Sequence, residues 1–249
     1  MKICHISDWH GSTTTLPSAD AYVVTGDMLP NFVLIKIQVD KWRRDGIVTY
    51  DPYGHLIGKP QAKPVGAYVG RLIVPEREKT LQRMWCAQHP FRRECGLDDD
   101  APVLVVRGNH DFIPLSDWIG GDVWEADDDP TRSTQLLGLK IGGFRGINYI
   151  MGEWSDELRR EQFDDRARRL PDDLDVLITH SPPLGILDRH HENYGSPALM
   201  SYLLRRTYGE NARPLRAHFF GHVHEAMGKE SRDGVLFSNA ATTTNEIEL

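Results

Sequence analysis

Short blocks of Asp, Asn and His along the chain have the residue types and spacing of metal ligands. Asp8 and His10 are two residues apart, so on an extended segment they point to the same side and can reach one ion. His222 and His224 repeat this spacing. Asp27 follows a glycine, and its two carboxylate oxygens could bridge two cations. We therefore expect these side chains to converge on a metal site.

Two further residues complete the set: Asn109 offers an amide oxygen and His180 an imidazole. Mixed nitrogen and oxygen donors suit Mn, Fe, Zn, Co or Ni better than Ca, and the blocks contain no thiolate. Two ions about 3.5–4 Å apart can lower the pKa of a bridging water, hold phosphoryl oxygens and stabilise charge during in-line displacement. The set therefore indicates phosphate chemistry at a pair of divalent ions.

His110 stands beside Asn109 but should point elsewhere. It could protonate a leaving oxygen or stabilise its charge, and Asp111 could orient the imidazole by accepting its other ring proton. We predict both as catalytic residues. Four more side chains are predicted to contact substrate: Trp9, Arg145, Asn148 and His191. Packing of Trp9 and a surface salt bridge of Arg145 are the open alternatives.

The blocks must be positioned by strands, because each follows a short apolar run typical of a buried strand. The runs cover residues 2–6, 21–25, 102–106, 174–178 and 217–220. In open α/β sheets, ligands collect outside the carboxyl ends of the strands. The five strand ends are therefore expected to meet at one edge.

Helices are expected between these strands. Residues 76–88 and 153–170 have helical spacing of apolar residues. A third helix should start at Pro197 with Ser196 as its N-cap and end at Gly209. Residues 29–75 are rich in Gly and Pro, which predicts hairpins and loops, and a flap near the site.

Composition limits the class of protein. The chain has 249 residues, 29 Lys and Arg against 36 Asp and Glu, and a net charge of −7. This balance argues against non-specific binding along a duplex but allows a small phosphorylated substrate, because bound cations reverse the local field. Three cysteines, no signal-peptide core and no long apolar stretch predict a cytoplasmic protein that does not enter a membrane.

Taken in order, the blocks resemble the calcineurin-like metallophosphoesterase family. They read Asp8-x-His10, Gly26-Asp27, Gly108-Asn109-His110-Asp111, Thr179-His180 and Gly221-His222-x-His224. The resemblance implies an α/β fold, a four-layer αββα sandwich with two mixed β-sheets flanked by helices. It also implies one domain over residues 1–249, with an insertion at about 29–75.

The same resemblance divides the ligands between two ions. One ion would be held by Asp8, His10, Asp27 and His224, and the other by Asp27, Asn109, His180 and His222. Manganese is favoured, with Fe, Zn, Ni, Co and Mg open. The chain departs from the family in one respect: the family often has an acidic residue shortly after the Gly-Asp block, where this chain has Met28-Leu29-Pro30-Asn31.

Residues 179–185 and 220–225 are similar to a subgroup of small phosphodiesterases. That similarity implies hydrolysis of small nucleotide phosphodiesters, for example cyclic nucleotides, by a metal-bound hydroxide. The alternatives are a phosphomonoesterase or protein phosphatase, a nuclease, and a non-catalytic metal-binding scaffold. A small phosphorylated partner is expected, without duplex nucleic acid. The sequence leaves open the native substrate, the metal and the oligomeric state.

Overall fold

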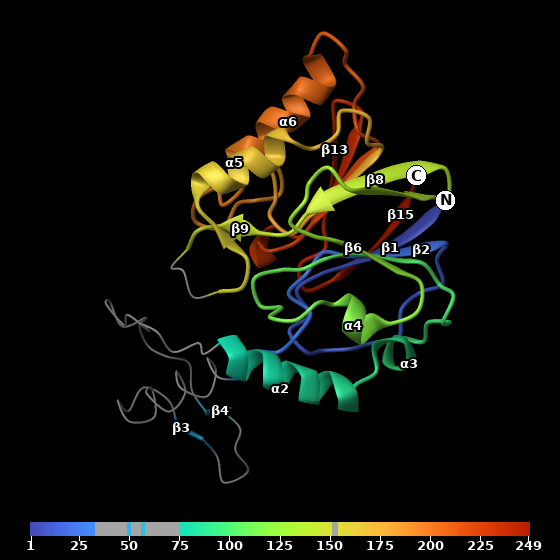
Figure 1. The fold of residues 1–249 in the computed structure, drawn as a ribbon, viewed down its shortest axis with the longest axis vertical. Helices are drawn as coiled ribbons and strands as arrows, with labels where there is room; N and C mark the ends of the chain where they lie inside the picture. The colour runs from blue at the N-terminus through green and yellow to red at the C-terminus, as the bar shows by residue number, and fades with distance from the viewer. Residues whose placement is uncertain (33–48, 51–55, 58–74, 151–153) are drawn as a thin grey trace.

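Two mixed β-sheets pack face to face and carry helices on their outer faces in the computed structural model (Figure 1). The structure describes residues 1–32, 49–50, 56–57, 75–150 and 154–249. The predicted four-layer αββα sandwich is therefore confirmed. Figure 1 shows α5 and α6 on one side of the sheets and α2, α3 and α4 on the other, with the two chain ends close together.

The first sheet has the strand order β15-β1-β2-β5-β6. Its strands are β1 (Lys2–Ile6), β2 (Ala21–Val24), β5 (Val103–Val106), β6 (Val123–Ala126) and β15 (Thr244–Glu248). Four of them run parallel, and β15 is antiparallel to β1, with Ile3 opposite Ile247. The carboxyl ends of β1, β2 and β5 therefore lie at one edge.

The second sheet has the order β13-β14-β12-β11-β8-β7. Its strands are β7 (Ser133–Leu136), β8 (Leu139–Phe144), β11 (Val176–Thr179), β12 (Ala217–Phe220), β13 (Gly228–Arg232) and β14 (Val235–Asn239). The four central strands are parallel and both edge strands are antiparallel. All five predicted strands are present, within two residues of their predicted ends.

Alternating side chains on the strands separate the layers, because successive residues of a strand face opposite sides. On β5, Leu104 and Val106 point between the sheets, whereas Val103 and Val105 point toward the helices. On β12, Phe219 lies between the sheets and Phe220 under the outer helices. Both faces of each central strand are therefore buried.

Among the described residues, five helices and one 3-10 turn complete the layers. They are α2 (Pro75–Gln88), α3 (Phe91–Cys95), α4 (Ser116–Ile119), α5 (Arg160–Arg168), α6 (Pro197–Tyr208) and η1 (His224–Ala226). The predicted limits of α2 and α6 are confirmed. Ser196 caps α6 by accepting a hydrogen bond from the Leu199 amide, and Gly209 follows its last turn.

The helix predicted over residues 153–170 is wrong in its first part. Glu157–Leu158 form β10, which pairs in parallel with β9 (Ile147–Asn148). Arg159 is extended, and its amide donates to the Gln162 side chain at 3.0 Å, so the helix begins only at Arg160. Tertiary pairing of β10 with β9 overrides the helical spacing of the sequence.

Part of the predicted insertion is described. β3 (Thr49–Tyr50) and β4 (Leu56–Ile57) form a short antiparallel pair, which agrees with the predicted hairpins. The predicted flap, and residues 33–48, 51–55, 58–74 and 151–153, lie outside the described residues. Across the described part of the chain, every helix is too short or too polar to cross a membrane.

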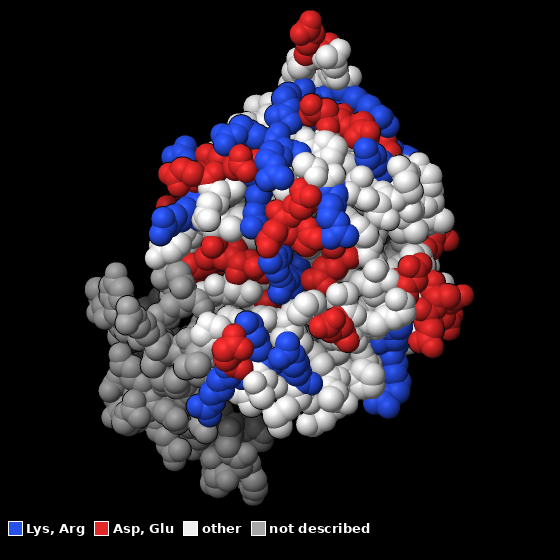
Figure 2. Space-filling view, in the orientation of Figure 1, with Lys and Arg blue, Asp and Glu red and all other residues white. Residues whose placement is uncertain are grey.

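The visible surface mixes the two charges. Figure 2 shows Lys and Arg interleaved with Asp and Glu over the face that carries α5. On α5 itself, Arg160 pairs with Asp164 at 3.8 Å and Arg168 with Asp165 at 3.7 Å. This face therefore presents no continuous basic patch, as the sequence predicted for this helix.

We expect substitution of Leu104 by Ala to destabilise the protein by about 2–5 kcal/mol, because it removes a side chain that is buried between the sheets and leaves a cavity. Substitution of Leu204 by Ala on α6 is the matched control, because that side chain is 49% exposed. Urea unfolding of the metal-free protein measures both. Equal effects would contradict the packing of the two sheets on each other.

Candidate binuclear metal site

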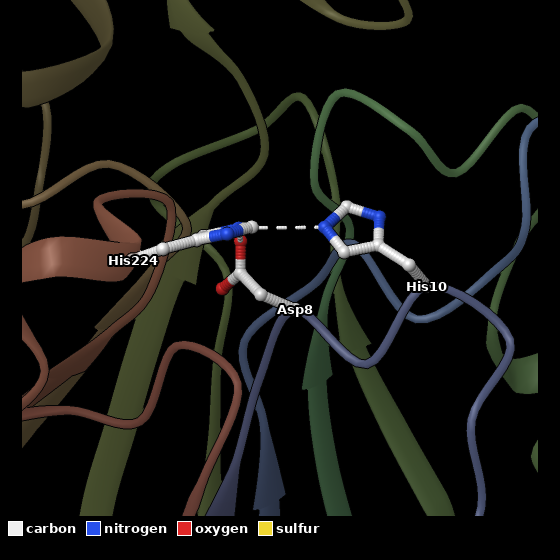
Figure 3. Close-up of side chains that lie close together, drawn as sticks. All are labelled: Asp8, His10 and His224. Atoms are coloured by element: carbon white, nitrogen blue, oxygen red, sulfur yellow. Dashed lines mark hydrogen bonds and ion pairs between the residues drawn. The ribbon is translucent and has the colours of Figure 1, made fainter. Parts of the chain in front are cut away.

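The first ligand group joins β1 to η1, which lie more than 200 residues apart in the chain. One ligand atom each from Asp8, His10 and His224 lies within 4.8 Å of the others. Asp8 Oδ1 is 3.1 Å from His224 Nε2, and His10 Nε2 is 3.4 Å from the same nitrogen. Figure 3 shows the two imidazoles pointing toward each other above the Asp8 carboxylate. Three of the four ligands predicted for the first ion are therefore brought together.

The second ligand group joins the ends of β2, β11 and β12. One ligand atom each from Asp27, His180 and His222 lies within 4.8 Å of the others. Asp27 Oδ2 is 3.2 Å from His180 Nε2, and the rings of His180 and His222 are 5.0 Å apart between centroids. Asn109 follows β5, the strand beside β2 in the sheet.

Two buried polar atoms test whether this site suits a cation. Asn109 Oδ1 is buried without a hydrogen-bond partner, and the buried His180 Nε2 has only its ion pair with Asp27 Oδ2. Buried polar atoms are costly unless something binds them. Both are good donors to a divalent ion. The residues present therefore fit the metal centre that the sequence predicts.

Four of these residues have a left-handed backbone that non-glycine residues rarely adopt. The φ angles are 58° at Asp8, 48° at His10, 53° at Asp27 and 73° at His222. Hydrogen bonds between the loops hold the first two: Asp8 N donates to Gly26 O at 2.8 Å and His10 N to Asp27 O at 3.0 Å. Strain of this kind gathers at functional sites, where the surrounding structure stabilises it.

Two glycines in the blocks are required by close approach. A β-carbon at Gly108 would overlap Asp27 Oδ1, and one at Gly221 would overlap Asp8 Oδ2. Any larger residue would push a carboxylate out of the site. Gly108 therefore makes room for the Asp27 carboxylate, and Gly221 makes room for the Asp8 carboxylate.

The charges of the ligands balance in the metal-free protein. Burial favours neutral carboxyls, but the hydrogen bond with His224 lowers the pKa of Asp8, and the charge on His180 holds that of Asp27 well below its usual range. Burial would lower the pKa of His180, but the Asp27 carboxylate raises it to about 10. Burial lowers the pKa of His222 to about 4. His180 therefore carries a proton that a metal must displace.

His110 lies beside both ligand groups. Its Nε2 is 3.7 Å from Asp27 Oδ2, and its ring packs edge-on to His10 with centroids 4.6 Å apart. Trp154 covers the ring at 4.4 Å, and the Asn31 side-chain amide contacts Nδ1. Burial lowers the pKa of His110, so the ring is neutral at neutral pH.

Asp111 was predicted to orient the His110 ring, but the structure gives its side chain other partners. Its buried carboxylate accepts hydrogen bonds from four backbone amides, those of Asp27, Met28, Leu29 and Gly108, at 2.7–3.0 Å. Burial, together with the charge of Asp27, raises its pKa to about 7, although the amide donors oppose this shift. Asp111 therefore fixes the loop that carries Asp27, and Asn31 takes the place beside the His110 ring.

The four residues predicted to contact substrate lie in different surroundings, and one of them lies beside the metal ligands. Trp9 lines a cavity with Asp8 and His10 and also packs in the core. Arg145 instead pairs with Asp128 and Asp156. Asn148 lies in β9 and His191 packs on the ring of His190. Within the described residues, these last three have no contact with the metal ligands.

Sequence reasoning missed Asn31, Trp154 and a row of threonines near the carboxyl end of the chain. The departure from the family pattern after Asp27 was the signal for Asn31. Trp154 was assigned to a helix face, but the hydrogen bond from Ser155 N to Asn109 O at 3.0 Å fixes its segment beside the site. No local spacing in the sequence indicates that contact.

A family model and several known proteins match parts of this chain. The family model described as calcineurin-like phosphoesterase matches residues 1–226. A UPF0046 protein of Caenorhabditis elegans is 40% identical over 154 residues, which are 55% of this chain and 51% of that protein. Human metallophosphoesterase domain-containing protein 1 is 34% identical over 113 residues, 44% of this chain and 32% of that protein. The chain thus matches about half or less of the length of these relatives.

One solved structure covers nearly the whole chain. It is that of a putative 5'-nucleotidase from Staphylococcus aureus in complex with alpha-ketoglutarate. The two share 10% sequence identity with a TM-score of 0.45, over 98% of this chain and 50% of that one.

We expect metal binding at pH 8 to release at least one proton, because His180, with its pKa raised to about 10, is still protonated there. An ordinary histidine, with a pKa of about 6.5, would release none at this pH. Calorimetric titration with Mn²⁺ in buffers of different ionisation enthalpy counts the protons. The affinity should rise by about tenfold per pH unit above neutrality for one released proton, and a heat independent of the buffer would contradict the ion pair of His180 with Asp27.

We expect substitution of Asp111 by Asn to lower the free energy of unfolding by about 2–4 kcal/mol, because an amide leaves at least two of the four backbone donors unsatisfied. Mn²⁺ affinity should fall as well, since the Asp27 loop loses its support. Substitution of the exposed Asp117 by Asn is the control. Unchanged stability together with lost turnover would instead favour the ring-orienting role predicted from the sequence.

Proposed function

Because the chain belongs to the calcineurin-like phosphoesterase family, we propose that it is a phosphoesterase with two divalent metal ions in one site. The ions would share Asp27. The other ligands of the first ion would be Asp8, His10 and His224, and those of the second Asn109, His180 and His222. When bound, such ions supply an activated water and positive charge against the phosphoryl oxygens.

The observation that carries this proposal is the convergence of potential ligand atoms around Asp27. Its Oδ2 lies 3.2 Å from His180 Nε2 and 3.7 Å from His110 Nε2. Asn109 Oδ1 is buried without a hydrogen-bond partner, and His180 Nε2 has only its ion pair with Asp27. A cation bound to these atoms would stabilise them together. A site built only for packing has no need of such a set.

His110 is the proposed catalytic residue. A neutral imidazole has one N–H, and an Asn31 amide that donates to Nδ1 places this proton on Nε2, the nitrogen that faces Asp27. His110 can then donate a hydrogen bond to the leaving oxygen and stabilise the charge that forms there. Of the two roles predicted from the sequence, charge stabilisation agrees better with a neutral ring.

We further propose that the substrates are phosphodiesters of small nucleotides, for example cyclic nucleotides. The loop sequences 179–185 and 220–225 support this class, and the net charge of −7 disfavours a duplex. Manganese is the favoured metal, and the cytoplasm the favoured location. Hydrolysis of bis(p-nitrophenyl) phosphate and of p-nitrophenyl phosphate with added Mn²⁺ tests the class. Turnover of the monoester alone would favour a phosphatase, and a lack of metal-stimulated turnover of both would overturn the proposal.

We expect substitution of His110 by Ala to lower kcat for bis(p-nitrophenyl) phosphate by about 100-fold to 10,000-fold, the usual contribution of such a group. The Mn²⁺ content should stay at two ions for each chain, because His110 is not among the proposed ligands. Substitution of His191 by Ala is the matched control, since that exposed ring has no contact with the metal ligands within the described residues. Full turnover of the His110 variant would remove this residue from the chemistry.

A further inference from the structure

A cavity of about 510 Å³ opens directly beside the first ligand group, where Asp8, His10 and His224 line it. Its volume lies within the range of about 300–1,000 Å³ that is usual for pockets that bind small molecules. The indole of Trp9 forms part of its wall. A group esterified to a phosphate at the metal site would therefore have room on this side.

The remaining lining residues all have hydroxyl-bearing side chains. They are Ser12, Thr13, Thr14, Thr242, Thr243 and Thr244. Each hydroxyl can both donate and accept a hydrogen bond. Thr13 donates to Glu94 Oε2 at 2.8 Å, whereas the other five have no protein partner among the described residues. Five hydroxyls are thus free to bond to a ligand.

Both hydroxyl segments are anchored to the chain around Asp8, so the cavity is already formed. Thr242 N donates to Ser7 O, and Thr243 N to Ala240 O, each at 3.0 Å. Ser7 also forms a parallel bridge with Ala241. On the opposite wall, Ser12 N donates to Trp9 O at 2.9 Å. The distance from the metal ligands to the hydroxyls is therefore fixed by backbone hydrogen bonds.

Beyond the proposed metal ligands, the described lining residues offer no cationic side chain to a second anionic group. Among the described residues, no Lys or Arg lines the cavity, and its one carboxylate, Asp8, faces the metal site. Burying a second phosphate here without a cationic partner would be unfavourable. The lining suits an uncharged group with several hydroxyls, whose C–H faces can pack on Trp9 and on the threonine methyl groups.

We propose that this cavity binds the uncharged, hydroxyl-bearing substituent of a phosphodiester, a sugar or other polyol, next to the reacting phosphate. This inference rests on the function proposed above. Thr242–Thr244 lie beyond residues 1–226, the part of the chain matched by the family model. Part of the hydroxyl lining thus comes from a segment outside that match, and Ser12, Thr13 and Thr14 lie within it.

Two phosphodiesters with the same leaving group test this proposal. They are 2,3-dihydroxypropyl p-nitrophenyl phosphate and n-propyl p-nitrophenyl phosphate, which differ only in two hydroxyls. We expect kcat/KM of the Mn²⁺-loaded protein to be about tenfold higher for the dihydroxypropyl ester, through KM rather than kcat, as two hydrogen bonds would give.

Substitutions in both hydroxyl segments test whether the cavity causes the preference for the dihydroxypropyl ester. Replacing Thr14 and Thr243 together by Val removes two hydroxyls at nearly constant shape and should abolish the tenfold preference. Replacing the same two residues by Ser keeps the hydroxyls and should retain the preference. Substitution of Thr80 by Val on α2 is the control, because its hydroxyl donates to Glu76 O at 2.8 Å, away from the cavity.

The outcomes separate the two proposals. Turnover of both esters with no preference, or with a preference that the double Val variant keeps, would overturn the polyol site and leave the phosphoesterase in place. Turnover of neither ester would overturn the proposed function, and the polyol site with it. A preference that is lost with Val and kept with Ser would support both.

Discussion

Three carboxylates buried at one end of the sandwich are the constraint on which the site depends. Asp8, Asp27 and Asp111 are 1%, 2% and 0% exposed, and among the described residues none of them forms an ion pair with Lys or Arg. Buried charges of one sign repel each other strongly unless something compensates them. Backbone amides take this role at Asp111, whereas imidazoles surround Asp8 and Asp27. Only at Asp8 and Asp27 could a metal ion take the place of the imidazole protons.

The fold brings these groups together at one edge of the two sheets, and this arrangement strains the backbone locally. Parallel strands in two packed sheets end at the same edge, so loops from both sheets meet there. The meeting requires left-handed backbone at Asp8, His10, Asp27 and His222, each of which costs about 1–3 kcal/mol. Hydrogen bonds between the β1 and β2 loops offset part of this strain. Divalent ions would stabilise the rest, and folding and metal binding would then be coupled.

The sequence predicted what depends on neighbouring residues and missed what depends on distant ones. Apolar runs that end in ligand residues located β1, β2, β5, β11 and β12, and the Ser196 cap located α6. By contrast, the partner of His110 could not be found from its neighbour Asp111, because four amides from two loops compete for that carboxylate. Trp154 is held beside the site by the hydrogen bond from Ser155 N to Asn109 O, a contact that the helical spacing around it concealed.

The proposed metal ligands and one wall of the proposed polyol site lie in different parts of the chain. All seven proposed ligands lie within residues 1–226, the part that the family model matches. One wall of the hydroxyl-lined cavity lies at 242–244, just before β15 pairs with β1. Because the antiparallel pairing of β15 fixes that wall to the strand that leads to Asp8, changes in residues 242–244 can alter the ester group that fits without moving a ligand. The same metal site could thereby serve different phosphodiesters in related chains.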